Sequence, residues 1–255
     1  SMKYTRRIVV FVYFGVAAMP LAWLALTSIK PNEDAITAYP KFIPSTSRSA
    51  TPEGIQFKAT LAAYRKLDEP YAGTNKTFFN YLYNSVVIGL LSTIASVALG
   101  TCCAYGFSRF RIAGSKDWLF FILSTRFLPP LAVVTPVLMM YRQFDLPNTH
   151  LGLILLYTVF NLSLSVWLMK GFIDEMPKAY EEAALVDGYS RFHAFHQIIL
   201  PQAARGMAVT AVFCLIAALN EYGFAMTLNN RSAVTVPVYF AGLQGNVEGI
   251  PWPQI

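Results

Sequence analysis

Long apolar stretches alternate with shorter polar ones along the whole chain. Each apolar stretch holds about twenty residues with at most one charge, which is the length that a helix needs to cross the roughly 30 Å hydrocarbon core of a bilayer. The stretches lie at about 8–29, 82–105, 118–140, 151–169 and 207–228. The pattern therefore predicts an all-α integral membrane protein, in which residues 1–255 form a single transmembrane domain.

The composition supports this fold class. Hydrophobic residues make up 55% of the chain and charged residues 13%, which is about half the charged share of a soluble domain. The mean hydropathy is +0.44. The formal net charge of +6 does not come from basic runs interleaved with aromatic residues. It therefore favours a role in membrane orientation over nucleic-acid binding, and we expect lipid around the protein and no nucleic-acid partner.

A short basic segment precedes the first apolar stretch, as it does in cleaved signal peptides. The apolar part of a signal peptide is shorter and ends in small residues, whereas this stretch ends at Ser28-Ile29-Lys30-Pro31, so we expect a retained first helix. The polar insert 30–77 that follows contains five prolines and is predicted to be irregular with one short amphipathic helix, 57–67. Three side chains of that helix share a face: Phe57, Leu61 and Tyr64.

Prolines interrupt the later part of the chain. Pro129-Pro130 and Pro136 break the third apolar stretch, which also carries Arg126. Beyond the fifth stretch the chain is predicted to be irregular, because its apolar run 234–243 is interrupted by Pro237 and is too short to cross a membrane.

The distribution of Lys and Arg predicts the orientation. If the N-terminus is cytoplasmic, the inside segments are 1–7, 105–117 and 170–205, and the outside segments are 30–77, 141–151 and 229–255. Lys and Arg are denser in the inside set, although the bias is modest. This orientation places the loop 174–205 in the cytoplasm.

The segment 176–205 is the only long charged segment between two apolar stretches in the second half of the chain. Pro177 suits the first turn of a helix, and Gly188 can end that helix in a left-handed conformation. Ser190 can cap a second helix, which Pro201 is predicted to end. Helical spacing gives each helix one apolar face: Ala179, Ala183 and Val186 on the first, and Phe192, Phe195 and Ile199 on the second. The segment is predicted to be a docking element; the alternative is an amphipathic helix–turn–helix lying on the membrane surface.

The same segment resembles the "EAA" loop of permease subunits in bacterial ABC importers. The match covers about twenty residues with a fixed internal spacing, which is far more specific than a lone glycine pattern. The matching residues are Glu182, Ala183, Ala184, Asp187, Gly188, Phe195, Ile198, Leu200 and Pro201. In that family the loop is a cytoplasmic pair of coupling helices that fits a cleft on the ATPase subunit. The resemblance therefore implies that loop 177–201 couples this chain to an ATPase.

Most of the chain is similar to the second permease of the maltose-type pair. The matching segments are Asn84-Ser85, Tyr105 to Arg109 with Gly114, Asn148-Thr149 with Gly152-Leu153-Ile154, and Asn220-Glu221-Tyr222. There are two departures. Leu219 stands where the family usually has Trp. Such permeases also have six spans, and since five are predicted here, we expect a sixth to follow residues 251–255.

The resemblance implies the type I transmembrane fold of ABC importers, and a subunit that forms half of the pathway for a sugar or sugar-like solute. The implied partners are a second permease, two ATPase subunits and a periplasmic solute-binding protein. The implied location is the bacterial inner membrane, with a multi-pass chain and a cytoplasmic N-terminus. The sequence has no G-x-x-x-x-G-K-[ST] loop, so ATP and Mg²⁺ are expected on the partner ATPase and not on this chain.

Polar groups inside the apolar stretches are the candidates for the solute pathway: Asn84, Arg126, Asn161, Asn220 and Glu221. A charge at the bilayer centre costs about 2.5–3.5 kcal/mol on insertion scales, so Arg126 and Glu221 are expected to face the bundle interior, a partner or water. Arg126 either pairs with Glu221 or binds an anionic group of the solute. The three asparagines either bind solute or link helices.

The sequence gives little support for a metal site, a disulfide framework or an enzyme active site. His193 and His196 have a helical spacing that could hold a metal, but no third ligand is near in sequence, so no metal site is predicted. The cysteines Cys102, Cys103 and Cys214 are expected to be buried free thiols. The sequence shows no catalytic cluster of the kind that a membrane enzyme would need. A secondary transporter or channel predicts inverted repeats and no cytoplasmic docking loop, and no repeat is found.

Overall fold

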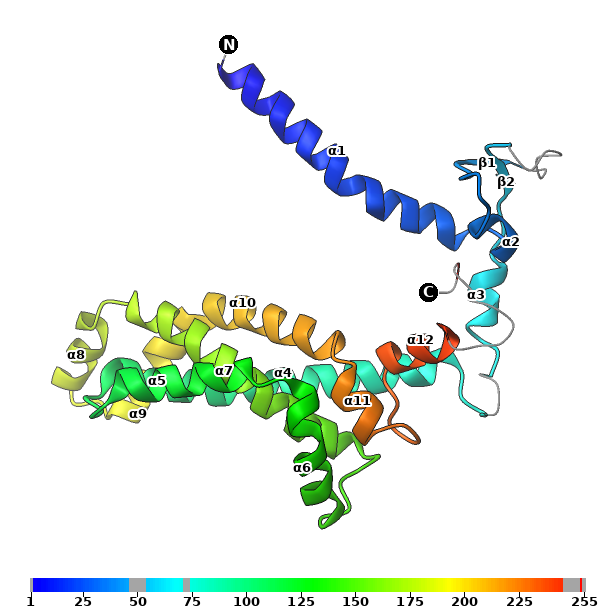
Figure 1. Cartoon of the computed structure of the whole chain (residues 1–255). Coiled ribbons are helices and arrows are strands. Elements are labelled where there is room, and N and C mark those ends of the chain that lie inside the picture. Colours follow the sequence, from blue (N-terminus) through cyan, green and yellow to red (C-terminus); the bar gives the residue numbers. More distant parts are fainter. Residues whose placement is uncertain (1, 46–53, 71–73, 245–252, 254–255) are drawn as a thin grey trace. The chain divides into compact units, whose positions relative to one another are not determined.

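The computed structural model describes residues 2–45, 54–70, 74–244 and 253 and is mainly helical (Figure 1). Its elements are α1 (Met2–Ser28), α2 (Asn32–Ala35), β1 (Ile43–Ser45), β2 (Gln56–Lys58), α3 (Ala62–Lys66), α4 (Phe78–Arg109), α5 (Ser115–Ser124), η1 (Thr125–Phe127), α6 (Pro130–Arg142), α7 (His150–Asp174), α8 (Ala179–Val186), α9 (Arg191–Ala194), η2 (Phe195–Ile199), α10 (Leu200–Leu219), α11 (Gly223–Leu228) and α12 (Val236–Gln244). The chain divides into two compact units, residues 1–80 with 240–255 and residues 81–239.

The first unit contains a small sheet that the all-α prediction missed. Strands β1 and β2 pair in parallel, with Pro44 opposite Phe57. The predicted helix 57–67 is wrong in its first half, because Phe57 lies in β2 and is fully buried there. Only α3 is helical, and Leu61 and Tyr64 are exposed instead of sharing a buried face with Phe57. The aromatic side chain suits a half-buried strand, and that packing overrides the helical spacing.

Lys30, directly after α1, is buried between aromatic rings. Its ammonium lies 3.9 Å from the centre of the Trp23 ring and 5.3 Å from that of Phe57. Burial lowers the pKa of Lys30 below its usual value, and the carboxylate of Asp34 opposes that shift. The ammonium is therefore held by cation–π contacts where water is largely excluded.

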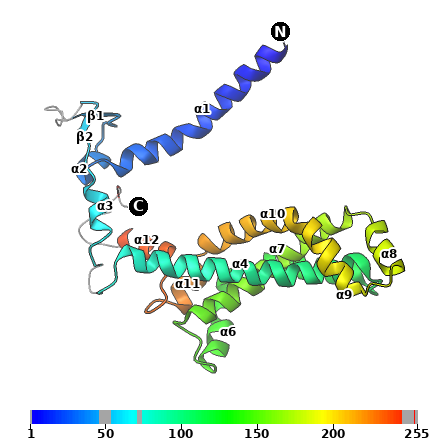
Figure 2. The same ribbon diagram turned by 180° about the vertical axis from the view of Figure 1, so that it is seen from behind.

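Three long helices, α4, α7 and α10, form the body of the second unit (Figures 1 and 2). Close packing of α4 on α7 depends on Gly100, where a Cβ would lie 2.6 Å from the Cβ of Ser165. Gly206 of α10 is similarly close to the ring of Phe172 in α7. Small residues thus allow the helix backbones to approach, as is common in membrane helix pairs.

The apolar core of this unit has two parts. One lies where α4, α6, α7, α10 and α11 meet and includes Ile88, Leu153 and Phe224. The other lies where the C-terminal ends of α4 and α7 meet η2 and the start of α10, and includes Met169, Ile173 and Ile199. The second part supports the loop that carries α8 and α9, at one end of the unit (Figure 2).

Several predicted element boundaries are corrected. The third stretch is divided into α5, η1 and α6, with a sharp bend at Pro129-Pro130, whereas Pro136 lies inside α6. The predicted helix 207–228 ends at Leu219, and α11 is a separate helix. The region after the fifth stretch is predicted to be irregular, but residues Val236–Gln244 form α12. Pro237 is the second residue of this helix, where a missing N–H costs nothing.

Four helical segments among the described residues are long and apolar enough to cross a membrane, and there are up to five if the bent pair α5–α6 is one span. The mainly helical class is thus confirmed, and four helices have the length and composition of membrane spans. The sixth span stays a prediction. The cysteines are free, but the prediction that all are buried is wrong: Cys214 is buried, whereas Cys102 and Cys103 are exposed.

Candidate coupling loop and solute-path residues

The bend between α8 and α9 forms as its sequence predicts. Gly188 has φ +85°, the left-handed region that only glycine enters without strain. The hydroxyl of Ser190 accepts a hydrogen bond from the N–H of His193 at 3.2 Å and caps α9. Both predictions are confirmed.

Pro201 does not end the second helix, contrary to prediction. The chain is helical without interruption from Arg191 to Leu219. Residues Phe195–Ile199 form a π-helical turn, in which the N–H of Leu200 donates to the carbonyl of Phe195, five residues back. Since Pro201 stands at the start of the following α-helix, directly after this wider turn, its missing N–H does not break the helix.

The side chains that the loop buries are not the ones that helical spacing placed on its predicted apolar faces. On α8 the buried residues are Glu181 and Ala184, while the predicted face, which includes Val186, is exposed, with Val186 at 87%. On the second helix Ile199 is buried, but Phe192 is 77% exposed. The π turn inserts an extra residue between these two positions, so they no longer share a face.

The residues matched to the family loop fall on both sides of it. Glu182, Ala183, Asp187, Gly188 and Pro201 are exposed; Phe195, Ile198 and Leu200 are half-buried; and Ala184 is buried. The loop therefore presents a mixed surface of small, apolar and acidic side chains. His193 stacks on the ring of Tyr189, with centroids 4.6 Å apart, and His196 stacks on Phe192.

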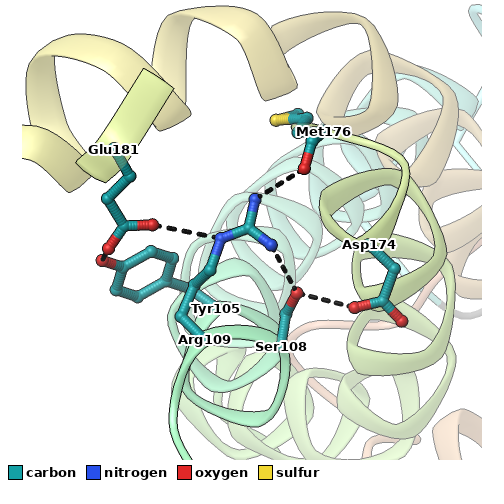
Figure 3. Close-up of polar contacts among 6 residues, drawn as sticks. All are labelled: Tyr105, Ser108, Arg109, Asp174, Met176 and Glu181. Atoms are coloured by element: carbon teal, nitrogen blue, oxygen red, sulfur yellow. Dashed lines mark hydrogen bonds and ion pairs between the residues drawn. The ribbon is translucent and has the colours of Figure 1, made fainter. Parts of the chain in front are cut away.

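A buried cluster of polar side chains fixes α8 to the end of α4 (Figure 3). Glu181 accepts a hydrogen bond from the hydroxyl of Tyr105 at 2.5 Å and one from the Nε of Arg109 at 3.1 Å. The side chains of Arg109 and Glu181 are only 3% and 5% exposed. Arg109 also donates to the carbonyl of Met176 at 3.1 Å, so it holds the segment that enters α8 as well. A buried ion pair with all its partners in place makes a rigid joint.

The cluster extends to the end of α7. Ser108 accepts a hydrogen bond from Arg109 at 3.2 Å and donates one to Asp174 at 2.6 Å (Figure 3). Asp174 also pairs with Lys170, one turn earlier on α7. The ends of α4 and α7 and the start of the loop thus form one connected network, which we call the anchor cluster: Tyr105, Ser108, Arg109, Asp174 and Glu181. Sequence reasoning did not assign Glu181 this role, although the i, i+4 spacing of Tyr105 and Arg109 on one face is a visible signal.

Three of the five pathway candidates meet at one cavity of about 200 Å³. Its lining residues are Arg126, Leu128, Tyr157, Phe160, Asn161, Ala217, Ala218, Glu221 and Phe224. They come from η1 and its C-cap, α7, α10 and α11 together with the α10–α11 link. The structure therefore brings Arg126, Asn161 and Glu221 together.

The carboxylate of Glu221 has its own partners. It accepts hydrogen bonds from the hydroxyl of Tyr157 at 2.8 Å and from the N–H groups of Phe224 and Ala225 at 3.0 and 3.2 Å. It thus caps the N-terminus of α11. Within the described part of the chain, no ion pair joins Glu221 to Arg126, whose guanidinium donates to the carbonyl of Phe160 at 3.5 Å.

The other two candidates lie elsewhere, and only Asn84 links different segments of the chain. The amide of Asn84 donates to the carbonyl of Val234 at 2.9 Å, and its oxygen is 2.9 Å from the Nε2 of His150. Asn220 donates to Ile216 in the preceding turn of α10. Neither asparagine lines the cavity.

Known proteins match most of this chain. The family described as "Binding-protein-dependent transport system inner membrane component" matches residues 96–253. The trehalose transport system permease protein SugB of Mycobacterium tuberculosis is 32% identical over 91% of this chain and 78% of its own length. The trehalose/maltose transport system permease protein MalG of Thermococcus litoralis is 33% identical over 79% and 72%.

A solved structure shares the fold. It is a bacterial ABC transporter involved in the import of the acidic polysaccharide alginate, and it matches with a TM-score of 0.71 at 18% identity, over 99% of this chain and 88% of that chain. These matches confirm the resemblance to permeases of carbohydrate-type ABC importers. The chain belongs to the family of inner-membrane components of binding-protein-dependent transport systems.

Proposed function

We propose that this chain forms half of the translocation pathway of an ATP-driven importer for a sugar or sugar-like solute, and that loop 177–201 couples it to an ATPase subunit. The permease relatives named for trehalose and maltose transport support the solute class. In this proposal a second permease completes the pathway, a periplasmic binding protein delivers the solute, and two ATPase subunits carry ATP and Mg²⁺.

The observation that carries the proposal is the outer surface of α8 and α9. Val186 is 87% and Phe192 77% exposed, and Glu182, one helical turn before Val186, is exposed as well. Apolar side chains in a charged loop are typical of a surface that a protein partner covers. We call this surface, defined by Glu182, Ala183, Val186 and Phe192, the coupling surface.

Motion of the coupling surface is transmitted by rigid connections. On one side, the anchor cluster joins α8 to the ends of α4 and α7 through the buried pair of Glu181 and Arg109. On the other, helix 191–219 continues from α9 into α10 without a break. An ATPase that pulls on the loop would therefore rotate three long helices together, which is the rigid-body type of switching.

The proposal extends to topology. The spans are about 8–29, 82–105, 118–140, 151–169 and the stretch that α10 occupies, with the N-terminus and the part of loop 174–205 that precedes α10 in the cytoplasm. The insert 30–77 then lies in the periplasm of a bacterial inner membrane. The bias of Lys and Arg toward the cytoplasmic segments supports this orientation.

Replacement of Phe192 tests the coupling role. Phe192→Ala, assayed in proteoliposomes with the partner subunits of the same importer, should lower solute-stimulated ATP hydrolysis about tenfold, because an exposed aromatic anchor of an interface contributes about 1–2 kcal/mol. Phe14→Ala removes a comparably exposed phenylalanine of α1, 69% against 77% for Phe192, and should leave the rate unchanged. The coupling assignment would be contradicted if the double variant Phe192→Ala/Glu182→Lys kept the full rate of solute-stimulated ATP hydrolysis.

A further inference from the structure

The guanidinium of Arg126 lines the cavity described above and has little of its hydrogen-bonding capacity used. Its one hydrogen bond within the described residues is the long contact of 3.5 Å to the carbonyl of Phe160. Arginine carries five N–H donors in a planar fork and keeps its charge at any pH that proteins experience. Arg126 is exposed at this cavity and makes no ion pair among the described residues, so its positive charge is available to an anion that enters the cavity.

Glu221 lines the same cavity but forms no ion pair with Arg126 among the described residues. Its two carboxylate oxygens are occupied by three donors, the Tyr157 hydroxyl and two N–H groups of α11. These bonds hold the carboxylate against the start of α11, where the helix dipole stabilises its charge. The hydrogen-bonding capacity of the Glu221 carboxylate is thus largely taken up by Tyr157 and the start of α11.

The remaining walls suit a sugar ring. Phe160 and Phe224 lie with their ring centroids 4.7 Å apart and both line the cavity, as does Tyr157. Asn161, held by a hydrogen bond from its amide to the carbonyl of Cys214 at 3.2 Å, adds a polar group to the lining. Apolar walls with a few fixed polar groups are the usual composition of a small-molecule site.

We propose that this cavity binds the anionic group of an acidic sugar, with Arg126 forming a forked pair with a carboxylate or similar oxyanion on a ring that packs against the aromatic walls. The inference rests on the proposed transport function and specifies its solute as anionic. A forked arginine–carboxylate pair distinguishes an acidic sugar from its neutral counterpart, because only the former neutralises the guanidinium.

Protection of a cysteine in the cavity tests this proposal with simple probes. Ala217→Cys is introduced into the complete importer, with Cys102, Cys103 and Cys214 replaced, in phosphatidylcholine nanodiscs. Its reaction with a small uncharged thiol reagent is followed against increasing glucuronate, glucose or acetate. Glucuronate should give half-maximal protection at an about tenfold lower concentration than glucose, since a charge-assisted hydrogen bond is worth at least that ratio. Acetate, which lacks the ring, should protect less than glucuronate.

Variants assign the effect to Arg126. Arg126→Gln should abolish the preference for glucuronate, Arg126→Lys should reduce it, and Arg142→Gln, an exposed arginine outside the cavity, should retain it. The inference is overturned if glucuronate and glucose protect equally, if neither protects, or if Arg126→Gln keeps the preference. Protection by phosphatidylglycerol in the nanodisc but not by glucuronate would overturn it in favour of a lipid headgroup. ATPase coupling measured on Phe192→Ala does not depend on these outcomes. The proposed function is therefore tested independently of the anionic solute.

Discussion

Two neighbouring glutamates on α8 have different environments. Glu181 is buried and bound to Tyr105 and Arg109, whereas Glu182 is exposed on the coupling surface. One residue of helix turns the side chain by about 100°, which is enough to separate an anchoring position from a docking position. The two glutamates are adjacent and chemically identical, yet Glu181 anchors the loop and Glu182 lies on the coupling surface.

Alanine substitutions should separate the two functions. Glu181→Ala leaves Arg109 buried without its counter-ion and should lower the free energy of unfolding by about 3–5 kcal/mol. Glu182→Ala should change it by less than about 0.5 kcal/mol, as is usual for surface positions. Thermal unfolding of the purified importer in detergent measures the difference. Equal unfolding temperatures for the two variants would show that the anchor cluster does not stabilise the loop.

At the scale of elements, the approach of α4 to α7 rests on one position. A Cβ at Gly100 would lie 2.6 Å from the Cβ and 3.1 Å from the backbone carbonyl carbon of Ser165. A side-chain rotation of Ser165 cannot relieve a clash with its own backbone, so the helices must separate. Gly106, farther along α4, has open space where its Cβ would be.

Gly100→Ala should therefore destabilise the helix pair by about 1–3 kcal/mol, the usual cost of overpacking a close contact. Gly106→Ala is the matched control and should be neutral or slightly stabilising, because alanine is the better helix former. The readout is the unfolding temperature together with the rate of proteolysis in detergent. A Gly100→Ala variant as resistant as Gly106→Ala would mean that α4 and α7 do not pack this closely.

Element boundaries show where sequence reasoning works and where it stops. Gly188 and Ser190 were predictable because a left-handed turn and an N-cap depend on local chemistry alone. The π turn at Phe195–Ile199 was not, since nothing in the local sequence distinguishes it from an α-turn. The start of α11 carries a signal that was overlooked: Glu221 stands three residues before Phe224, at the position of a capping side chain.

The sites show the same limit. The spacing of Tyr105 and Arg109 indicates that they share a helix face, but it does not identify Glu181 as their partner, because Glu181 lies 76 and 72 positions away from them. Arg126 and Glu221 were correctly singled out as costly intramembrane charges, and they do line one cavity. The structure does not show the predicted alternative of an ion pair between them. The carboxylate of Glu221 accepts hydrogen bonds from the first N–H groups of α11 instead. Burial cost identifies a functional candidate but does not choose its partner.

At the scale of the whole molecule, the bent pair of helices α5 and α6 decides the topology. If the pair crosses the membrane as one span, three crossings separate the polar insert after α1 from the loop after α7, and the two segments face opposite sides. If the pair enters and returns, two crossings separate them and they face the same side. Apolar length alone permits either arrangement.

Cysteine labelling should show that the pair crosses. In a variant without Cys102, Cys103 and Cys214, cysteines are placed singly at the exposed positions Ile36 and Lys178. A membrane-impermeant thiol reagent should label Ile36→Cys in spheroplasts and Lys178→Cys only in inside-out vesicles, because the basic loop segments favour the cytoplasm. Phe144→Cys, directly beyond α6, should follow Ile36→Cys if the pair crosses. Labelling of Lys178→Cys from the same side as Ile36→Cys, with Phe144→Cys labelled from the opposite side, would instead make α5–α6 a re-entrant pair. Labelling of Lys178→Cys from outside would also contradict the cytoplasmic position of the coupling surface and with it the docking of an ATPase.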